Sequence, residues 1–147
     1  MKLHIISVHH KLPSWASDAI ADYVKRMPAD CAMVLKELKP EINPAKEAQK
    51  IREAIPKSSY IVALDERGKD VSTQALSEQL AHWRTLGQDV TLLIGGADGL
   101  DPELKKEAQL TLRLSSLTLP HAMAKLLLIE QLYRAWTILQ GHPYHRV

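Results

Sequence analysis

Apolar and polar positions follow two alternating patterns along the chain. Short apolar runs suited to β-strands are each followed by a longer segment whose apolar residues recur at helical spacing. The apolar runs predict strands at residues 3–8, 31–38, 59–64, 89–96 and 112–115. The helical spacing predicts helices at residues 14–27, 43–55, 72–86, 101–110 and 118–140. Strand and helix therefore alternate through the whole sequence.

Residues that favour helix ends mark several of these boundaries. Asn43 and Asp101 each precede a proline, which is typical of a helix start because the side chain caps the first amides and proline fits the first turn. Gly87 and Gly141 follow two of the predicted helices and are expected to end them. The charged segment 65–70 is predicted to be a turn.

This alternation predicts an α/β fold, with a mainly parallel sheet and helices on both of its faces. The two most apolar runs, 61–64 and 90–94, are expected to be central strands. No linker, internal repeat or low-complexity segment interrupts the sequence, and 147 residues is a usual size for one domain. We therefore predict a single domain over residues 1–147.

Composition excludes several classes of protein. Apolar residues make up 46% of the chain, but the longest aliphatic run, 126–129, is far too short to cross a bilayer. The first residues show no signal-peptide pattern. Cys31 is the single cysteine, which excludes an internal disulfide and fits a reducing compartment, and we expect it to pack rather than to react. These features predict a cytoplasmic protein with no membrane segment.

The net charge of the chain is modest. Its formal value is +2 at pH 7, whereas a protein that grips naked nucleic acid by electrostatics alone usually carries more positive charge. A polyanionic partner is therefore expected to meet a local basic patch, or the combined patches of two subunits.

A glycine-rich turn follows the fourth predicted strand. Gly95, Gly96 and Gly99 fit neither the Gly-Lys-Ser/Thr pattern of a phosphate loop nor the G-x-G-x-x-G turn of a dinucleotide site. Asp98 and Asp101 would also repel a pyrophosphate near the next helix. Two interpretations stay open at this point. The glycines allow close packing of the chain's own backbone, or they bring that backbone close to another ligand.

The segment before the last helix has a second unusual pattern. Small polar residues alternate with leucines over residues 114–119, and Pro120 then begins the helix. Backbone polar groups beside apolar side chains suit a purine ring and a thioether or sulfonium better than a phosphate. An ordinary connection between a strand and a helix is the alternative interpretation.

Groups able to bind a ligand gather towards the C-terminus. Glu130 and Arg134 are four residues apart on the last helix and are expected to form an ion pair, although Arg134 also has the option of facing a ligand. The last residues add further candidates, namely His142, Tyr144, His145 and Arg146. No cysteine or carboxylate cluster joins these histidines or the pair His9 and His10, so we predict no metal site.

Three stretches together resemble one known family. "LLIGGADGL", "LSSLTLPHAMAKLLLIEQLYRAW" and the terminal "HPYHR" resemble the small bacterial 23S rRNA pseudouridine N3-methyltransferases of the SPOUT superfamily. The opening "MKLHIISVHHKLPSW" and the later "ALDERGK" extend the resemblance over the whole chain. The last two of the three stretches are highly specific in combination, whereas a lone G-G-x-x-G would not be.

The resemblance implies a fold and a cofactor. In this superfamily the C-terminal half forms a trefoil knot, and S-adenosylmethionine binds in a bent form among three loops of that knot. Alternation of strands and helices alone predicts an unknotted sheet, because true knots are nearly absent from proteins. Carried onto this sequence, the cofactor-binding residues are Leu64, Gly95, Gly96, Leu114, Ser115, Ser116, Leu117, Thr118 and Leu119.

The resemblance also implies a reaction and its partners. The family methylates N3 of a pseudouridine in 23S rRNA as a homodimer, with the partner chain bordering each cofactor pocket. The candidates for proton transfer and charge stabilisation are His121, Arg134, Tyr144 and His145, the last three forming a nucleoside pocket that the tail reaches across the dimer. Small size and modest charge predict that the substrate is the assembled ribosome. The alternatives are a non-catalytic ribosome-binding module and another nucleotide-binding α/β protein.

Overall fold

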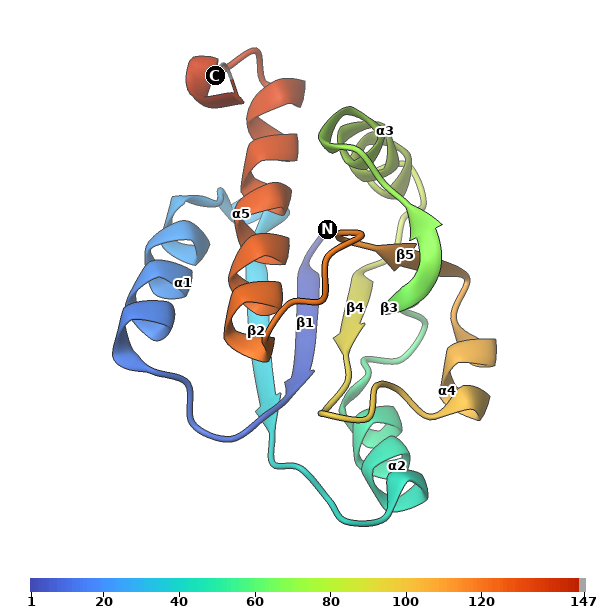
Figure 1. Cartoon of the computed structure of the whole chain (residues 1–147). Helices are drawn as coiled ribbons and strands as arrows, with labels where there is room; N and C mark the ends of the chain where they lie inside the picture. Colours follow the sequence, from blue (N-terminus) through green and yellow to red (C-terminus); the bar gives the residue numbers. More distant parts are fainter. Residues whose placement is uncertain (146–147) are drawn as a thin grey trace.

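A five-stranded sheet forms the centre of the computed structural model, which describes residues 1–145 (Figure 1). Its strands lie in the order β2-β1-β4-β3-β5, and each neighbouring pair is parallel. The strands are β1 (Leu3–Val8), β2 (Met33–Leu38), β3 (Tyr60–Asp70), β4 (Val90–Ile94) and β5 (Leu110–Arg113). The predicted parallel sheet is therefore confirmed, with the apolar strand β4 in its centre.

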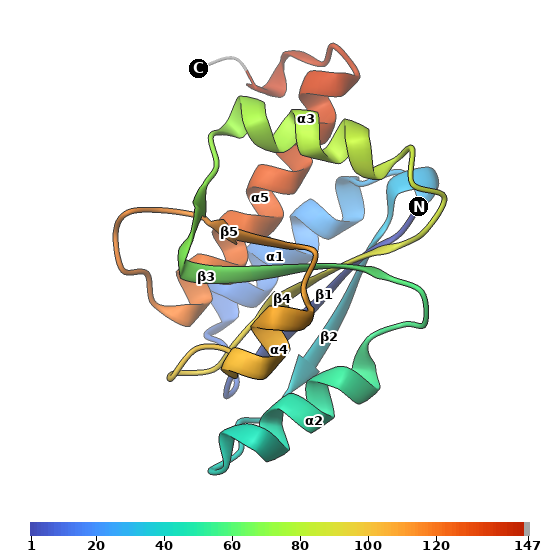
Figure 2. The same cartoon turned by 90° about the vertical axis from the view of Figure 1, so that its right-hand side faces the viewer.

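Helices cover both faces of this sheet, as the alternating pattern predicted (Figure 2). The helices are α1 (Ser14–Arg26), α2 (Pro44–Ala54), α3 (Thr73–Trp83), α4 (Pro102–Glu107) and α5 (His121–Leu139), with short 3₁₀ turns η1 (Ala29–Cys31) and η2 (Pro143–His145). α1, α3 and α5 pack on one face, and α2 and α4 pack on the other. Successive residues of β4 point to opposite faces, so Leu92 joins the first core and Leu93 joins the second.

Side-chain caps begin three of the helices where the sequence predicted a start. The Asn43 side chain accepts hydrogen bonds from the first amides of α2, Ser72 caps α3, and Asp101 caps α4. Each cap satisfies amides that the helix leaves unpaired and is worth roughly 1 kcal/mol. The caps thus determine the residue at which each of α2, α3 and α4 begins.

The predicted turn at residues 65–70 is wrong. β3 continues to Asp70, and its pairing with β5 shifts register between Leu64 and Lys69. Gly68 permits this irregular stretch, because a Cβ there would lie 2.7 Å from the carbonyl carbon of Leu112 in β5. Much of this part of the strand is exposed, so charged residues are tolerated there. A charged segment that lacks alternating apolar residues is typical of a turn, which explains the wrong prediction.

Several further boundaries differ from their predictions by a few residues, among them those of β5 and α4. β5 begins at Leu110 rather than Leu112, because Leu110 pairs with Val62 and Leu112 with Leu64. α4 ends at Glu107, so the predicted helix at 101–110 was too long.

No helix within residues 1–145 is long and apolar enough to span a membrane. Cys31 is fully buried in the core, as expected of a packing residue, and burial raises the pKa of its thiol.

The path of the C-terminal part determines where the loops of the sheet gather. From β5, at the edge of the sheet, the chain returns through residues 114–120 to α5, which packs against α1 and α3 (Figure 2). This segment lies near the carboxyl ends of β3 and β4. The trefoil knot itself stays a prediction.

Candidate functional site

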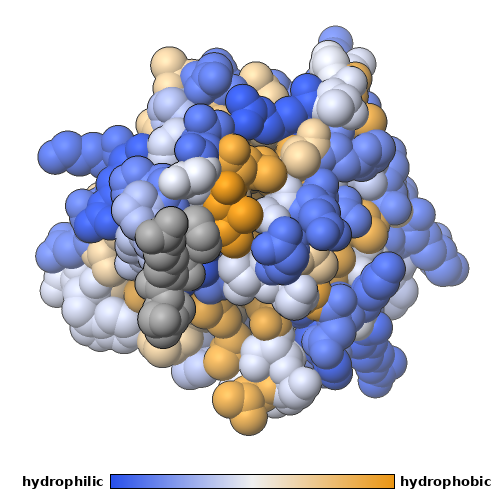
Figure 3. Space-filling view, turned by 90° about the horizontal axis from the view of Figure 1, so that it is seen from above, coloured by the Kyte–Doolittle hydropathy of each residue, from blue (hydrophilic) through white to orange (hydrophobic). Residues whose placement is uncertain are grey.

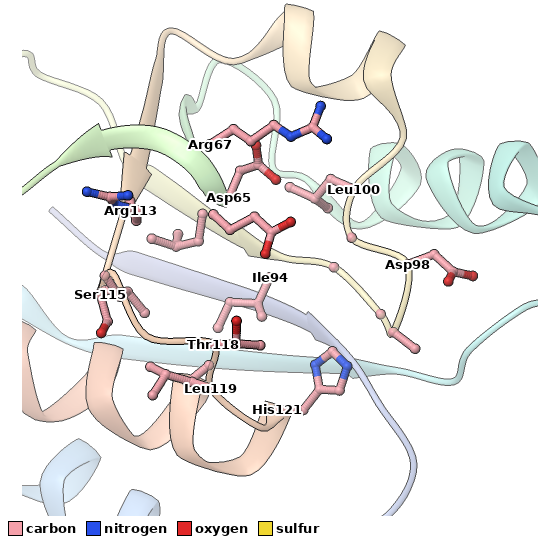
Figure 4. Close-up of a pocket in the computed structure, with 18 of the residues that line it drawn as sticks. Asp65, Arg67, Ile94, Asp98, Leu100, Arg113, Ser115, Thr118, Leu119 and His121 are labelled. Atoms are coloured by element: carbon pink, nitrogen blue, oxygen red, sulfur yellow. The ribbon is translucent and has the colours of Figure 1, made fainter.

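A cavity of about 530 Å³ opens at the carboxyl ends of the central strands (Figure 4). The walls are formed by residues 64–67 of β3, by residue 94 at the end of β4 with residues 95–100 after it, and by residues around the end of β5. His121 and Ala124 add the start of α5. Ligands of parallel α/β sheets usually bind at this edge, and the volume lies within the usual range for cofactor sites.

Most of the predicted cofactor-binding residues meet at this cavity. Eight of the nine line it, although they come from three separate segments of the chain: Leu64, Gly95, Gly96, Leu114, Ser115, Leu117, Thr118 and Leu119. Ser116 lies outside its lining. The Ser115 hydroxyl accepts a hydrogen bond from the Leu117 amide at 2.9 Å, so this side chain shapes the loop itself.

The glycine loop closes on its own backbone. A Cβ at Gly95 would lie 2.5 Å from the carbonyl carbon of Gly99, far inside van der Waals contact. Gly99 has a φ of 77°, and its amide donates to the carbonyl oxygen of Gly96 at 2.9 Å. Gly95 is therefore required by packing within the loop, and the same backbone lines the cavity. Close packing of the chain's own backbone, the first of the two interpretations left open by the sequence, is thus confirmed for Gly95. Close approach of this backbone to a ligand stays a prediction.

Charged side chains of both signs surround the cavity. The largely buried carboxylate of Asp65 lies 3.5 Å from the ammonium group of Lys105. Arg113 donates to the Asp70 carboxylate at 3.0 Å, and this bond lowers the pKa of Asp70. Arg67 also lines the cavity (Figure 4). None of these residues was predicted to bind a ligand, although Asp65 directly follows a predicted strand, which is where the site residues of parallel sheets gather.

Arg134 and Tyr144 form a separate cluster around Glu130. Arg134 Nη2 and Tyr144 Oη each donate to Glu130 Oε2 at 2.8 Å. The Tyr23 hydroxyl lies 2.9 Å from that of Tyr144, and the Tyr133 ring meets the Tyr144 ring edge-on. The predicted ion pair of Glu130 with Arg134 is thus confirmed, and Tyr144 joins it.

Within one chain this cluster lies far from the cavity. Arg134 follows His121 by 13 residues on the same helix, or about 20 Å at about 1.5 Å per residue. Figure 1 shows the C-terminus at the far end of α5 from the loop that precedes this helix. His145 lies in η2, but its side chain and Arg146 are outside what the structure describes. Of the three predicted catalytic residues whose side chains are described, only His121 lines the cavity.

The surface at the C-terminal end of the molecule is mostly hydrophilic (Figure 3). A small apolar patch lies among the polar groups in this view.

In residues 1–145 no group of three or more histidine, cysteine, aspartate or glutamate side chains is arranged to hold a metal ion. The His142 ring instead accepts a hydrogen bond from the Tyr144 amide at 3.1 Å.

Replacing Tyr144 by phenylalanine is expected to change how stability depends on pH. Burial raises the pKa of Tyr144, and its hydrogen bonds with Tyr23 and Glu130 raise it further. Its stabilising contribution is therefore complete below the ordinary tyrosine pKa of about 10 and is lost as the pH rises above that value. The variant should lose about 1 kcal/mol near neutral pH, because it lacks these hydrogen bonds.

Urea unfolding at several pH values measures this effect. The free energy of unfolding should fall more steeply above about pH 10 in the wild type than in the variant. Parallel curves for the two proteins would show that Tyr144 is not held in its neutral form by the cluster.

Comparison with known proteins places the chain in a family. A family model described as a predicted SPOUT methyltransferase matches residues 1–145. The ribosomal RNA large subunit methyltransferase H of Polynucleobacter asymbioticus is 68% identical over 146 residues, which cover 99% of each chain. The protein of that name from Paraburkholderia phymatum is 55% identical over 156 aligned positions, which cover all of both chains.

Solved structures agree with this fold. A probable methylase family protein from Haemophilus influenzae Rd KW20 matches with a TM-score of 0.59 at 15% identity, over 99% of this chain and 70% of that one. A second structure, described with the 2-OH methylation of C/U34 on tRNA, has a TM-score of 0.55 at 18% identity, over 96% and 98% of the chains. By its family match and its close relatives, the chain belongs to the SPOUT methyltransferase family.

Proposed function

We propose that the protein transfers a methyl group from S-adenosylmethionine to N3 of a pseudouridine in 23S rRNA. One observation carries this proposal. Eight residues predicted to bind the cofactor line one cavity, in a chain that is 68% identical to a ribosomal RNA large subunit methyltransferase. The identity of the nucleoside and of its reacting atom comes from the sequence resemblance alone.

The lining of the cavity fits this cofactor. Leucines at 64, 114 and 119 provide apolar surfaces for an adenine ring, and the loop at 95–99 offers backbone polar groups beside them. Acidic and basic side chains line the cavity in equal number, so its net charge favours no polyphosphate. The loop after β4 also lacks the Gly-Lys-Ser/Thr pattern that would hold phosphates. The cavity is therefore expected to prefer S-adenosylmethionine to ATP.

The sulfonium of the bound cofactor supplies an already activated methyl group. The protein must then align the base and remove the N3 proton. We assign proton acceptance to His121, because it lines the cavity and a ring nitrogen of a neutral imidazole can accept a proton. Arg134 is assigned to the negative charge that develops on the base, and Tyr144 and His145 to the walls of the nucleoside pocket.

A second copy of the chain is needed to bring these groups together. Arg134 and Tyr144 lie too far along α5 to reach the cavity of their own chain, so we propose that they serve the cavity of a dimer partner. Large apolar side chains near the cavity support a partner there: Leu117 is 75% exposed and Met123 is 46% exposed. We further propose that residues 1–147 form a single domain with the knot of its superfamily.

The proposed substrate is the assembled ribosome, in the cytoplasm. The net charge of +2 leaves little general attraction for RNA, so neighbouring ribosomal surfaces are expected to contribute to recognition. Methyl transfer from labelled S-adenosylmethionine tests this, with ribosomes and protein-free rRNA from a strain that lacks the enzyme. We expect label in the ribosomes and far less in the free rRNA. Equal labelling would contradict the ribosome substrate, and no labelling of either would contradict the proposed activity.

A further inference from the structure

Lys125 is the one charged residue that is buried within residues 1–145. Its side chain is only 1% exposed, and it lies on α5 four residues after His121. Residues four apart share one side of a helix, and the neighbouring Ala124 lines the cavity. Lys125 therefore lies in the first turns of α5, close to the two residues of this helix that line the proposed cofactor site.

Two strands hold the ammonium group of Lys125. Its Nζ lies 3.2 Å from Nε2 of His9, which follows β1, and 3.4 Å from Oε1 of Glu37 in β2. His9 Nδ1 lies 2.7 Å from the carbonyl oxygen of His10, which can only accept. In the neutral ring Nδ1 therefore carries the proton, and the single lone pair of Nε2 faces both the Lys125 ammonium group and the Ser7 hydroxyl, which lies 3.0 Å away.

The residues around Lys125 are also connected to the cavity through the sheet. Ser7 is fully buried and pairs across the strands with Ile94, which lines the cavity. Lys125 thus connects the start of α5 to the carboxyl ends of β1 and β2. β1 lies next to β4, the strand that leads into the glycine loop. The start of α5 and the end of β4 both line the cavity.

Stability alone does not account for a lysine at this position. Burial lowers the pKa of Lys125, which reports the cost of keeping its charge away from water, and Glu37 offsets part of that cost. Glu37 is 56% exposed, so water can solvate its carboxylate if the lysine is replaced, and no buried charge is left unpaired. A methionine would fill the same space without the charge.

We propose that Lys125 is a positioning residue, which His9 and Glu37 hold so that the start of α5 and the loop at 114–119 are fixed around the cavity. The inference rests on the proposed function, because it assigns the fixed geometry to the binding of cofactor and base. Lys125 acts through His121 and the loop and does not itself touch the reacting atoms.

Lys125→Met is the main test. The variant should fold with a melting temperature close to that of the wild type, yet its kcat should fall by about tenfold or more, because small displacements of reacting groups are costly. Hydrogen exchange should become faster in the peptides that cover residues 114–125, and bound S-adenosylmethionine should protect them less. Lys125→Arg keeps the donors and the charge and should restore part of both properties.

Arg52→Met is the matched control. Arg52 forms a 3.1 Å ion pair with Glu107 on the other face of the sheet, so its loss should leave kcat and the exchange of residues 114–125 unchanged. Wild-type kcat and wild-type exchange in Lys125→Met would overturn the inference. If that variant does not fold, Glu37→Gln decides, because Glu37 is half exposed. A lower kcat with faster exchange in Glu37→Gln supports the inference, and wild-type values overturn it.

Failure of this inference differs from failure of the proposed function. Exchange in the free protein needs no substrate, so it reports the positioning role even if the methylated nucleoside is another one. Wild-type protein that does not bind S-adenosylmethionine would instead contradict the proposed function.

Discussion

Alanine at position 95 is expected to weaken cofactor binding strongly, whereas alanine at position 96 is expected to be tolerated. The added methyl group at 95 would meet the backbone of Gly99 at 2.5 Å, and backbone atoms cannot rotate away. At 96 it would lie 3.3 Å from Oε1 of Glu47, the mobile end of a long side chain. Both positions line the cavity. A difference in affinity between the two variants would therefore come from the shape of the loop and not from the distance of the substitution to the cavity.

The expected size of the effect follows from the loop that must move. Overpacking of this kind costs about 1–3 kcal/mol, and displacement of residues 96–99 should weaken S-adenosylmethionine binding by about tenfold or more. Titration calorimetry measures the affinity, and thermal unfolding shows that each variant is folded. In the wild type the same calorimetry should show binding of S-adenosylmethionine and none of ATP, which also separates a methyltransferase from a nucleotide-binding protein. Equal affinities for Gly95→Ala and Gly96→Ala would contradict the role given to the loop.

Deletion of residues 142–147 is expected to abolish methylation while leaving cofactor affinity nearly unchanged. Tyr144 and the residues beside it belong to the proposed nucleoside pocket, and they lie at the far end of α5 from the cavity of their own chain. The deletion removes the ring that packs against Tyr133, so the melting temperature must be measured beside the activity. Tyr144→Phe retains that ring and provides the matched control for packing. Full activity of the deletion variant would contradict the nucleoside pocket.

Mixed dimers show which chain the tail serves. Each Gly95→Ala chain has a defective cavity and an intact tail, and each chain without residues 142–147 has the reverse. Co-expression of the two should restore roughly a quarter of the wild-type activity if the tail acts on the partner, since half of the random dimers are mixed and each mixed dimer has one complete site. No recovery would contradict action across the dimer.

Much of the fold could be predicted because its signals are local. Caps at Asn43 and Asp101 and the apolar run at 90–94 each depend on a few neighbouring residues. The continuation of β3 past Leu64 could not be predicted in this way. It depends on the close approach of Gly68 to the backbone of Leu112, which lies far away in the sequence.

The site shows the same division. The resemblance identified the segments that line the cavity, but not that the contact at Gly95 is made by the chain itself. It also gave no sign that Lys125 is buried, since a lysine after apolar residues on a helix usually reaches solvent. The separation of Arg134 from His121 was visible as sequence distance, yet only the straight helix between them turns it into a distance in space.

Mass spectrometry of 23S rRNA from a strain that lacks this protein tests the central claim most directly. Nuclease fragments from the deletion strain should lack the mass of a methyl group on a single pseudouridine, and a plasmid copy of the gene should restore it. The Gly95→Ala variant, expressed at the same level, should not. An rRNA with an unchanged set of methyl groups in the deletion strain would contradict the proposed function.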